Sequence, residues 1–246
     1  CKDGNDDDKG EKLVLLPSRI GRTVALLFIF LYVIEFITRQ ILIAIQDVHF
    51  ILEDERNRNI LARHIGVDAF CCFVIAFTGY KARHIVGDVL FSNSTRTTTY
   101  DRMVRQYPEG ARILVFFIAF QCKNLIDTIV WGDGPEYVMH HILAIFSSLG
   151  GLLLGSCHFY AIFYMGLSES STGILCLLAN FDKNGHGIMD LADAFPNTKV
   201  VLGCIFGISF VYIRIYLWMK LTLYYYFPDF RSVISEKVRP QITKNQ

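Results

Sequence analysis

The sequence predicts an all-α protein, a polytopic membrane bundle of about six transmembrane helices. Its 246 residues are 52% hydrophobic and only 19% charged, and its mean hydropathy is +0.36. Soluble domains contain about 25% charged residues, so this composition favours a chain that lies mostly within a bilayer. Apolar segments that approach the length of a membrane helix recur along the chain. We expect six spans, at residues 23–45, 65–80, 111–130, 135–155, 157–181 and 200–227.

The first two spans are separated by a charged hinge at residues 53–63, and a polar tail, residues 1–22, precedes them. Glu35 and Arg39 stand four residues apart in the first span. Residues at this spacing share one face of a helix, so we expect the two charges to neutralise each other. The second span is short, which flanking side chains that reach the membrane surface can accommodate.

The third and fourth spans carry the polar residues of greatest interest. Lys123 and Asp127 form a second opposite-charge pair at a spacing of four. The sequence Gly134-Pro135-Glu136 then predicts the start of a helix, because Pro is pre-organised for the first position and an acid suits the positive end of the helix dipole. Two adjacent histidines, His140 and His141, lie one to two turns inside this helix.

The histidine pair is the main candidate for chemistry. No charged residue accompanies it between Tyr137 and Gly155, and polar side chains at such depth mark functional sites by default. The alternative is that both histidines only bond to neighbouring helices. Adjacent helix residues point about 100° apart, so we expect one histidine to face a cavity and the other a neighbouring helix. His140 leads a stripe of small residues and is favoured for the cavity; the stripe continues through Ala144, Ser147 and Gly151.

The last two spans each contain a notable charge. Glu169 is the only acid of the fifth span and lies among Ser and Thr residues, so we expect it inside the bundle as a third candidate catalytic residue. Arg214 interrupts the sixth span. We expect Arg214, with Lys123 and Asp127, to face the bundle interior and contribute to lipid binding.

The basic residues predict the orientation. The tails and loops on the side of the two termini hold about three times as many Lys and Arg residues as the loops on the other side. The positive-inside rule therefore predicts cytosolic termini. Asn93-Ser94-Thr95 has the form of a glycosylation sequon, and we expect it to be unused because it falls in a cytosolic loop.

The segment from residue 182 to 193 partly follows the calcium-binding EF-hand loop. Its departures are a histidine at the fifth position and a shorter acid at the twelfth, and the alternative is a chance match in a Gly-rich turn. The positions concerned are Asp182, Asn184, His186, Asp190 and Asp193. The seven cysteines show no CxxC or Cys/His ligand spacing. We expect no resident metal or cofactor.

Three segments resemble the TLC-domain family (TRAM, LAG and CLN homology): WGDGPEYVMHH, GLSESSTGILCLLANF and FVYIRIYLW. The resemblance covers about residues 60–227. It divides the chain into an N-terminal tail at 1–22, a first helix and hinge at 23–59, the TLC domain at 60–227 and a C-terminal tail at 228–246. It implies a multi-helix protein of the endoplasmic reticulum or another endomembrane, linked to lipid synthesis, transport or sensing.

The resemblance also implies candidate roles. The ceramide synthases of this family are thought to use the paired histidines, here His140 and His141, and carry His-Asp-x-Ser-Asp downstream. This chain has Leu167-Ser-Glu-Ser-Ser-Thr172 instead, so it looks more like the TLC-domain-containing branch, whose members are not all enzymes.

The leading hypothesis is a role in membrane lipid homeostasis, with a lipid bound near the histidine pair. One alternative is a sphingoid-base N-acyltransferase with acyl-CoA as a substrate, and another is a lipid transporter or cargo receptor. Membrane lipids are the expected partners. The net charge of +1, without a basic face, argues against nucleic acid.

Overall fold

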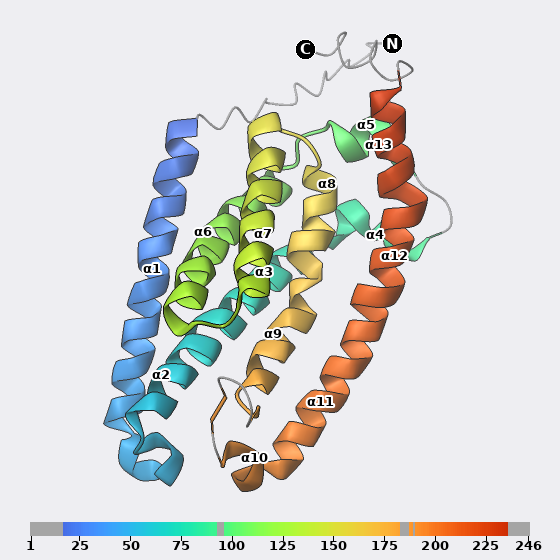
Figure 1. The fold of residues 1–246 in the computed structure, drawn as a ribbon. Helices are drawn as coiled ribbons and strands as arrows, with labels where there is room; N and C mark the ends of the chain where they lie inside the picture. Colours follow the sequence, from blue (N-terminus) through green and yellow to red (C-terminus); the bar gives the residue numbers. More distant parts are fainter. Residues whose placement is uncertain (1–16, 93–95, 183–186, 189, 236–246) are drawn as a thin grey trace, which may run out of the picture.

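The computed structural model describes residues 17–92, 96–182, 187–188 and 190–235. Within these residues six helical segments are long and apolar enough to cross a membrane: Ser18–Ala44, Glu55–Lys81, Thr99–Trp131, Pro135–Leu154, His158–Ala179 and Pro196–Ile234. The prediction of an all-α bundle with about six spans is confirmed. The start of the first segment and the end of the last lie at the same end of the bundle (Figure 1).

The N-terminal part of the bundle is formed by two long helical segments that are joined by two short 3₁₀ turns. Its elements are α1 (Pro17–Ala44), the short 3₁₀ turns η1 (Gln46–Val48) and η2 (Phe50–Leu52), α2 (Glu55–Arg63), the π-helical η3 (His64–Ala69) and α3 (Phe70–Lys81). The prediction of a charged hinge at 53–63 is wrong for most of this segment. Residues from Glu55 onward are helical and continue into the second span, because Asp54 caps the helix by accepting a hydrogen bond from Arg56 N at 2.8 Å.

The middle of the chain contains two short helices before the long central helix. These are α4 (Arg83–Phe91) and α5 (Thr99–Met103), followed by α6 (Pro108–Trp131) and α7 (Pro135–Leu154). Pro135 begins α7, as its sequence predicts. Gly132 (φ 69°) ends α6 and Gly155 (φ 59°) ends α7, both in the left-handed conformation that glycine adopts without strain.

The C-terminal part comprises a fifth span and a long, nearly continuous sixth. The fifth consists of α8 (His158–Ala161), the π-helical η4 (Ile162–Leu167) and α9 (Glu169–Ala179). After α10 (Leu191–Ala194), the sixth runs through α11 (Pro196–Phe210), η5 (Val211–Leu217), α12 (Trp218–Leu221), η6 (Thr222–Tyr226) and α13 (Phe227–Ile234). Both η5 and η6 are π-helical. Such wide turns are rare and often occur at functional sites.

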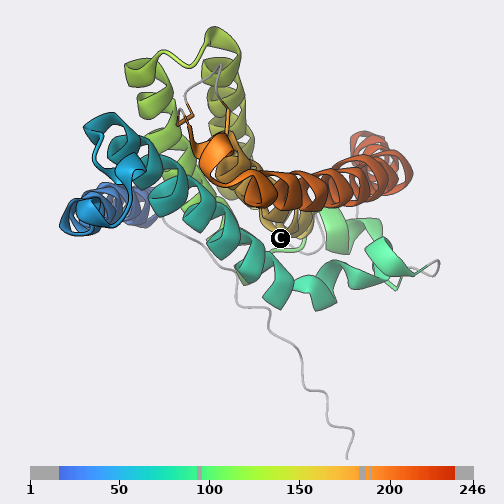
Figure 2. The same ribbon diagram turned by 90° about the horizontal axis from the view of Figure 1, so that it is seen from below.

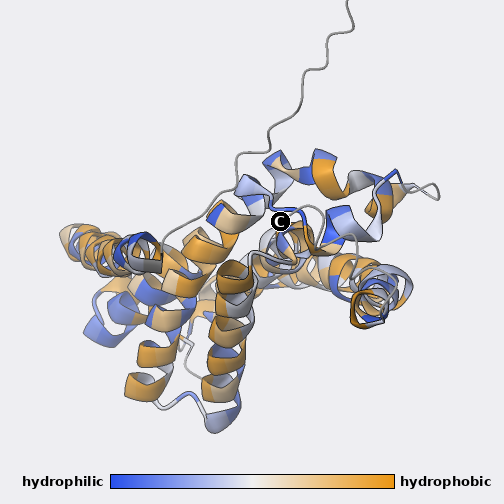
Figure 3. Cartoon of the chain, turned by 90° about the horizontal axis from the view of Figure 1, so that it is seen from above, coloured by the Kyte–Doolittle hydropathy of each residue, from blue (hydrophilic) through white to orange (hydrophobic). Residues whose placement is uncertain are grey.

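The buried core lies around α3, α6 and η4, where it includes Ile75, Phe117 and Phe163. Large apolar side chains also cover the outside, such as Phe36 on α1 and Ile208 on α11, which are 61% and 74% exposed. The long helices are accordingly coloured as hydrophobic on their outer faces too (Figure 3). This is the pattern of helices that face lipid rather than water.

The charged residues of the first span do not pair with each other, so the expected contact between Glu35 and Arg39 is wrong. Glu35 lies 2.6 Å from the Lys123 ammonium, and Arg39 lies 2.7 Å from Glu55. Lys123 is fully buried on α6, and the approach of α1 to α6 supplies it with a second carboxylate. The expected pair of Lys123 with Asp127 is confirmed.

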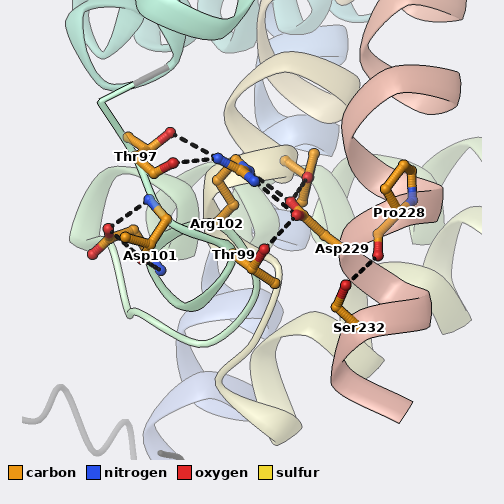
Figure 4. A network of polar contacts seen from close by, with 9 residues as sticks. Thr97, Thr99, Asp101, Arg102, Pro228, Asp229 and Ser232 are labelled. Atoms are coloured by element: carbon orange, nitrogen blue, oxygen red, sulfur yellow. Dashed lines mark hydrogen bonds and ion pairs between the residues drawn. The ribbon is translucent and has the colours of Figure 1, made fainter. Parts of the chain in front are cut away.

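A polar network fastens the short helix α5 to α13 (Figure 4). The Arg102 guanidinium donates to both carboxylate oxygens of Asp229, from Nε at 2.6 Å and from Nη2 at 2.7 Å. Thr99 and Tyr160 donate their hydroxyls to the same carboxylate. Because Arg102 and Asp229 are both buried, this network holds one end of the last span against the bundle.

Candidate functional site

A cavity of about 1830 Å³ occupies the space between α6 and α7 on one side and α9 and α11–α13 on the other. Seen from below, the red end of the sixth span, which carries α13, lies well to one side of the α6–α7 pair (Figure 2). Sites for small molecules usually have volumes of about 300–1,000 Å³, so this cavity has room for a larger molecule. Its wall is mainly apolar and aromatic and includes Phe206, Phe210 and Trp218.

One end of the cavity is polar and is built from the second, third and fourth spans. Its lining side chains are Arg63, Asp68, Asn124, Asp133, His140 and His141. The π-helical η3 carries Asp68, α6 carries Asn124, and α7 carries the histidines one to two turns after its start. Helix packing therefore gathers residues that are widely separated in the sequence.

His141 is tied to α6 by a hydrogen bond. Its Nδ1 atom lies 2.6 Å from Oε1 of Gln121, and both side chains are buried. An amide oxygen only accepts hydrogen bonds, so His141 Nδ1 carries a proton, and in the neutral ring Nε2 then keeps its lone pair. This arrangement leaves Nε2 able to accept a proton or a hydrogen bond.

His140 is in a different environment. Its side chain is exposed and lines the cavity, and its ring packs edge-to-face on the His141 ring with centroids 5.3 Å apart. The two histidines are thus not equivalent, as expected: His140 faces the open space, whereas His141 reaches the cavity while bonded to a neighbouring helix.

Ion pairs hold the residues of this polar end in place on the side that faces away from the cavity. The Arg63 guanidinium donates to Asp133 at 2.6 Å and lies 4.0 Å from Asp127. Asp127 also pairs with Lys123. Lys123 and Asp127 are not among the residues that line the cavity, so in this structure they form the charged layer behind its wall.

A second polar group lies on the opposite wall, where α9 meets η5. Arg214 donates to Glu169 at 2.9 Å and to the Thr172 hydroxyl at 2.7 Å, and it stacks on the Trp218 ring at 4.9 Å. Glu169 also accepts a weak hydrogen bond from the Cys72 thiol at 3.6 Å. Glu169 therefore lies inside the bundle within reach of Arg214, as expected, and its described contacts are not with the histidines.

The family-model comparison matches the TLC domain over residues 62–243. The chain belongs to the TLC-domain family. No curated protein and no solved structure matches the chain. Every residue that lines the cavity falls within the matched range, so the cavity is a feature of the TLC domain itself, whereas α1 precedes it.

The loop that resembles an EF-hand lies after α9 in the TLC domain. Two of its expected ligands, Asn184 and His186, lie outside the described residues, as does the sequon at Asn93. Among the residues that the structure does describe, no group of three or more His, Cys, Asp or Glu side chains is placed to hold a metal ion.

Several residues of the polar end are not among those predicted from the sequence, namely Arg63, Gln121, Asn124 and Asp133. A signal for part of this set was available. Gln121, Asn124 and Thr128 recur at spacings of three and four in the third span, which places them on one face of the helix. No comparable pattern points to Arg63, whose partner Asp133 lies 70 positions further along the chain.

Proposed function

We propose that this TLC-domain protein binds a membrane lipid in the cavity and acts through it in membrane lipid homeostasis. The polar part of the lipid lies at His140 and His141, and its acyl chain lies along the aromatic wall of α11–α13. The protein belongs to an endomembrane such as the endoplasmic reticulum, and its termini are cytosolic.

The observation that carries this proposal is the combination of a polar end and an apolar wall in a single large cavity. An acyl chain gains little by leaving the bilayer for an equally apolar cavity, because lipid tails are as apolar as leucine side chains. The affinity must therefore come from the headgroup, and the polar end provides hydrogen-bonding groups for it.

The test uses the full chain purified in mild detergent, with co-purifying lipids measured by mass spectrometry. Ser147 lines the cavity from α7, whereas Leu143 on the same helix is 60% exposed and is not among the lining residues. Ser147→Phe places a ring inside the cavity, where it competes with the lipid for space, and should lower the lipid content. Leu143→Phe is the matched control and should retain it. Equal lipid content in both variants would contradict the proposal.

A second candidate function, acyl transfer, is favoured by the hydrogen bond between His141 and Gln121. With its proton on Nδ1, His141 offers Nε2 as a general base that takes a proton from an amine as it attacks an acyl-CoA thioester. The amide bond forms, the carbon–sulfur bond breaks, and coenzyme A leaves as its thiol. Purified protein incubated with a labelled sphingoid base and acyl-CoA should then form an N-acyl product, and His141→Asn should abolish it. If the protein retains a lipid but forms no more N-acyl product than empty nanodiscs do, the result supports lipid binding alone.

A further inference from the structure

The Asp68 carboxylate lies inside the bundle, and its Oδ1 atom is buried without a hydrogen bond to any described residue. Its residue is only 8% exposed, it lines the polar end of the cavity, and among the described residues it forms no hydrogen bond and no ion pair. The Asn124 amide, which also lines the cavity, likewise has a buried oxygen that accepts no hydrogen bond. Buried polar groups without partners are costly, so both side chains have unused capacity to bind a ligand.

Arg63 adds unused donors to the same end of the cavity. It uses Nη2 to bond Asp133, whereas its buried Nε and Nη1 atoms make no hydrogen bond. Arg63 and Asp68 both line the cavity, and among the described residues they do not form an ion pair with each other. A carboxylate and a guanidinium that both line a cavity without touching leave a place for a group that donates to one and accepts from the other.

Charge decides which headgroups suit this place. Among the described residues, the four acids Glu35, Asp68, Asp127 and Asp133 outnumber the two cations Arg63 and Lys123, and His64 also lines this end of the cavity. A phosphate would be repelled by the excess of acids. An ammonium could donate to Asp68 but could accept nothing from Arg63, and it would lie beside that cation. A hydroxyl carries no charge, donates to a carboxylate and accepts from a guanidinium.

We propose that the polar end of the cavity selects a lipid with an uncharged headgroup that carries hydroxyls, one of which bridges Asp68 and Arg63. A second hydroxyl can donate to His141 Nε2 or to the unpartnered amide oxygen of Asn124. This inference rests on the proposed lipid-binding function and adds the headgroup class to it. Such hydroxyls occur in glycerides and in ceramides, and the experiment separates these two sources.

The test uses the full chain in nanodiscs and four photo-crosslinkable lipids that share one acyl chain. Their headgroups are a glycerol diol (a monoacylglycerol), a ceramide, a glycerol phosphate and a primary amine. Crosslinks are located by peptide mass spectrometry. We expect one or both hydroxyl probes to label η3, α6 or α7 in a saturable way, about tenfold more strongly than the phosphate and amine probes, since an unpaired buried polar group costs about that factor or more. The stronger of the two hydroxyl probes identifies the source.

Asp68→Asn tests the assigned residue. It removes the carboxylate that repels phosphate while Arg63 remains, so labelling by the phosphate probe should rise and labelling by the hydroxyl probes should fall. A gain of labelling requires folded protein, so loss of folding cannot imitate it. Asp47→Asn, at an exposed acid outside the cavity, is the matched control and should leave all four signals unchanged.

The outcomes separate the two proposals. Labelling of the cavity mainly by the amine or phosphate probe would overturn the headgroup class while leaving lipid binding intact, and so would an Asp68→Asn profile identical to that of the unaltered protein. If no probe labels the cavity, lipid binding itself is wrong, and the headgroup inference fails with it.

Discussion

Gly79 and Gly166 meet where α3 crosses η4, with no side chain between the two backbones. A Cβ atom on Gly79 would lie 2.9 Å from the Gly166 carbonyl carbon and 2.7 Å from the backbone nitrogen of Leu167. Backbone atoms cannot swing aside as the end of a flexible side chain can. This contact therefore sets how closely the second and fifth spans approach, as small residues do between membrane helices.

Gly79→Ala should destabilise the protein by about 1–3 kcal/mol, the usual cost of overpacking a core. Gly87→Ala on α4 is the control, because a Cβ there meets nothing within 4 Å, and it should be neutral or slightly stabilising. Thermal unfolding of the purified variants in detergent measures both. Equal midpoints for the two variants would show that the crossing tolerates a methyl group.

Lys123→Met should destabilise the protein by about 3–5 kcal/mol, because it leaves the carboxylates of Glu35 and Asp127 without their cation in a buried site. The triple variant Lys123→Met, Glu35→Gln, Asp127→Asn removes all three charges together and should recover part of the loss. Thermal unfolding and folded yield measure the effect. A single variant as stable as the parent would mean that the carboxylates find other partners.

Asp229→Asn should loosen α13, because Arg102 loses the buried carboxylate that it contacts through two nitrogens; we expect a cost of about 3–5 kcal/mol. Arg105→Gln is the comparison, since the Arg105 side chain is 54% exposed in its ion pair with Asp101 and such pairs contribute about 0–1 kcal/mol. Limited proteolysis after α12 reports the release of the last helix. Equal cleavage in both variants contradicts this role of Asp229.

The two histidines should respond differently to replacement by alanine. His140→Ala should keep normal abundance and lose bound lipid, because the exposed ring faces the cavity and makes few contacts within the protein. His141→Ala should lower the folded yield as well, since it leaves the buried Gln121 oxygen without its donor, at a cost of about 1–3 kcal/mol. Size-exclusion profiles and lipid content measure these effects. Full lipid content at normal yield in both variants would leave the pair without a role.

Tags at either terminus should be accessible from the cytosol and protected from luminal reagents, following the distribution of basic residues. Protease protection of sealed microsomes measures this orientation. Glycosylation of Asn93 in the natural protein would show that the chain is inserted the other way round.

The sequence by itself determined the features that depend on neighbours along one helix. Hydropathy gave the six spans, because the bilayer acts on each segment separately. Pro135 and Glu136 gave the start of α7, and a spacing of four gave the contact between Lys123 and Asp127. The family motifs indicated the TLC domain, which the family model matches.

Only the tertiary structure decided which helices meet. Glu35 has Arg39 at the favourable spacing, yet it pairs with Lys123, because the packing of α1 against α6 brings it to a buried cation. The same packing joins His141 to Gln121 and Arg63 to Asp133. It also brings Asp68 to the cavity wall, where its Oδ1 atom has no hydrogen bond to a described residue. Helical spacing fixes which residues share a face, whereas the partner of that face depends on the arrangement of all the spans at once.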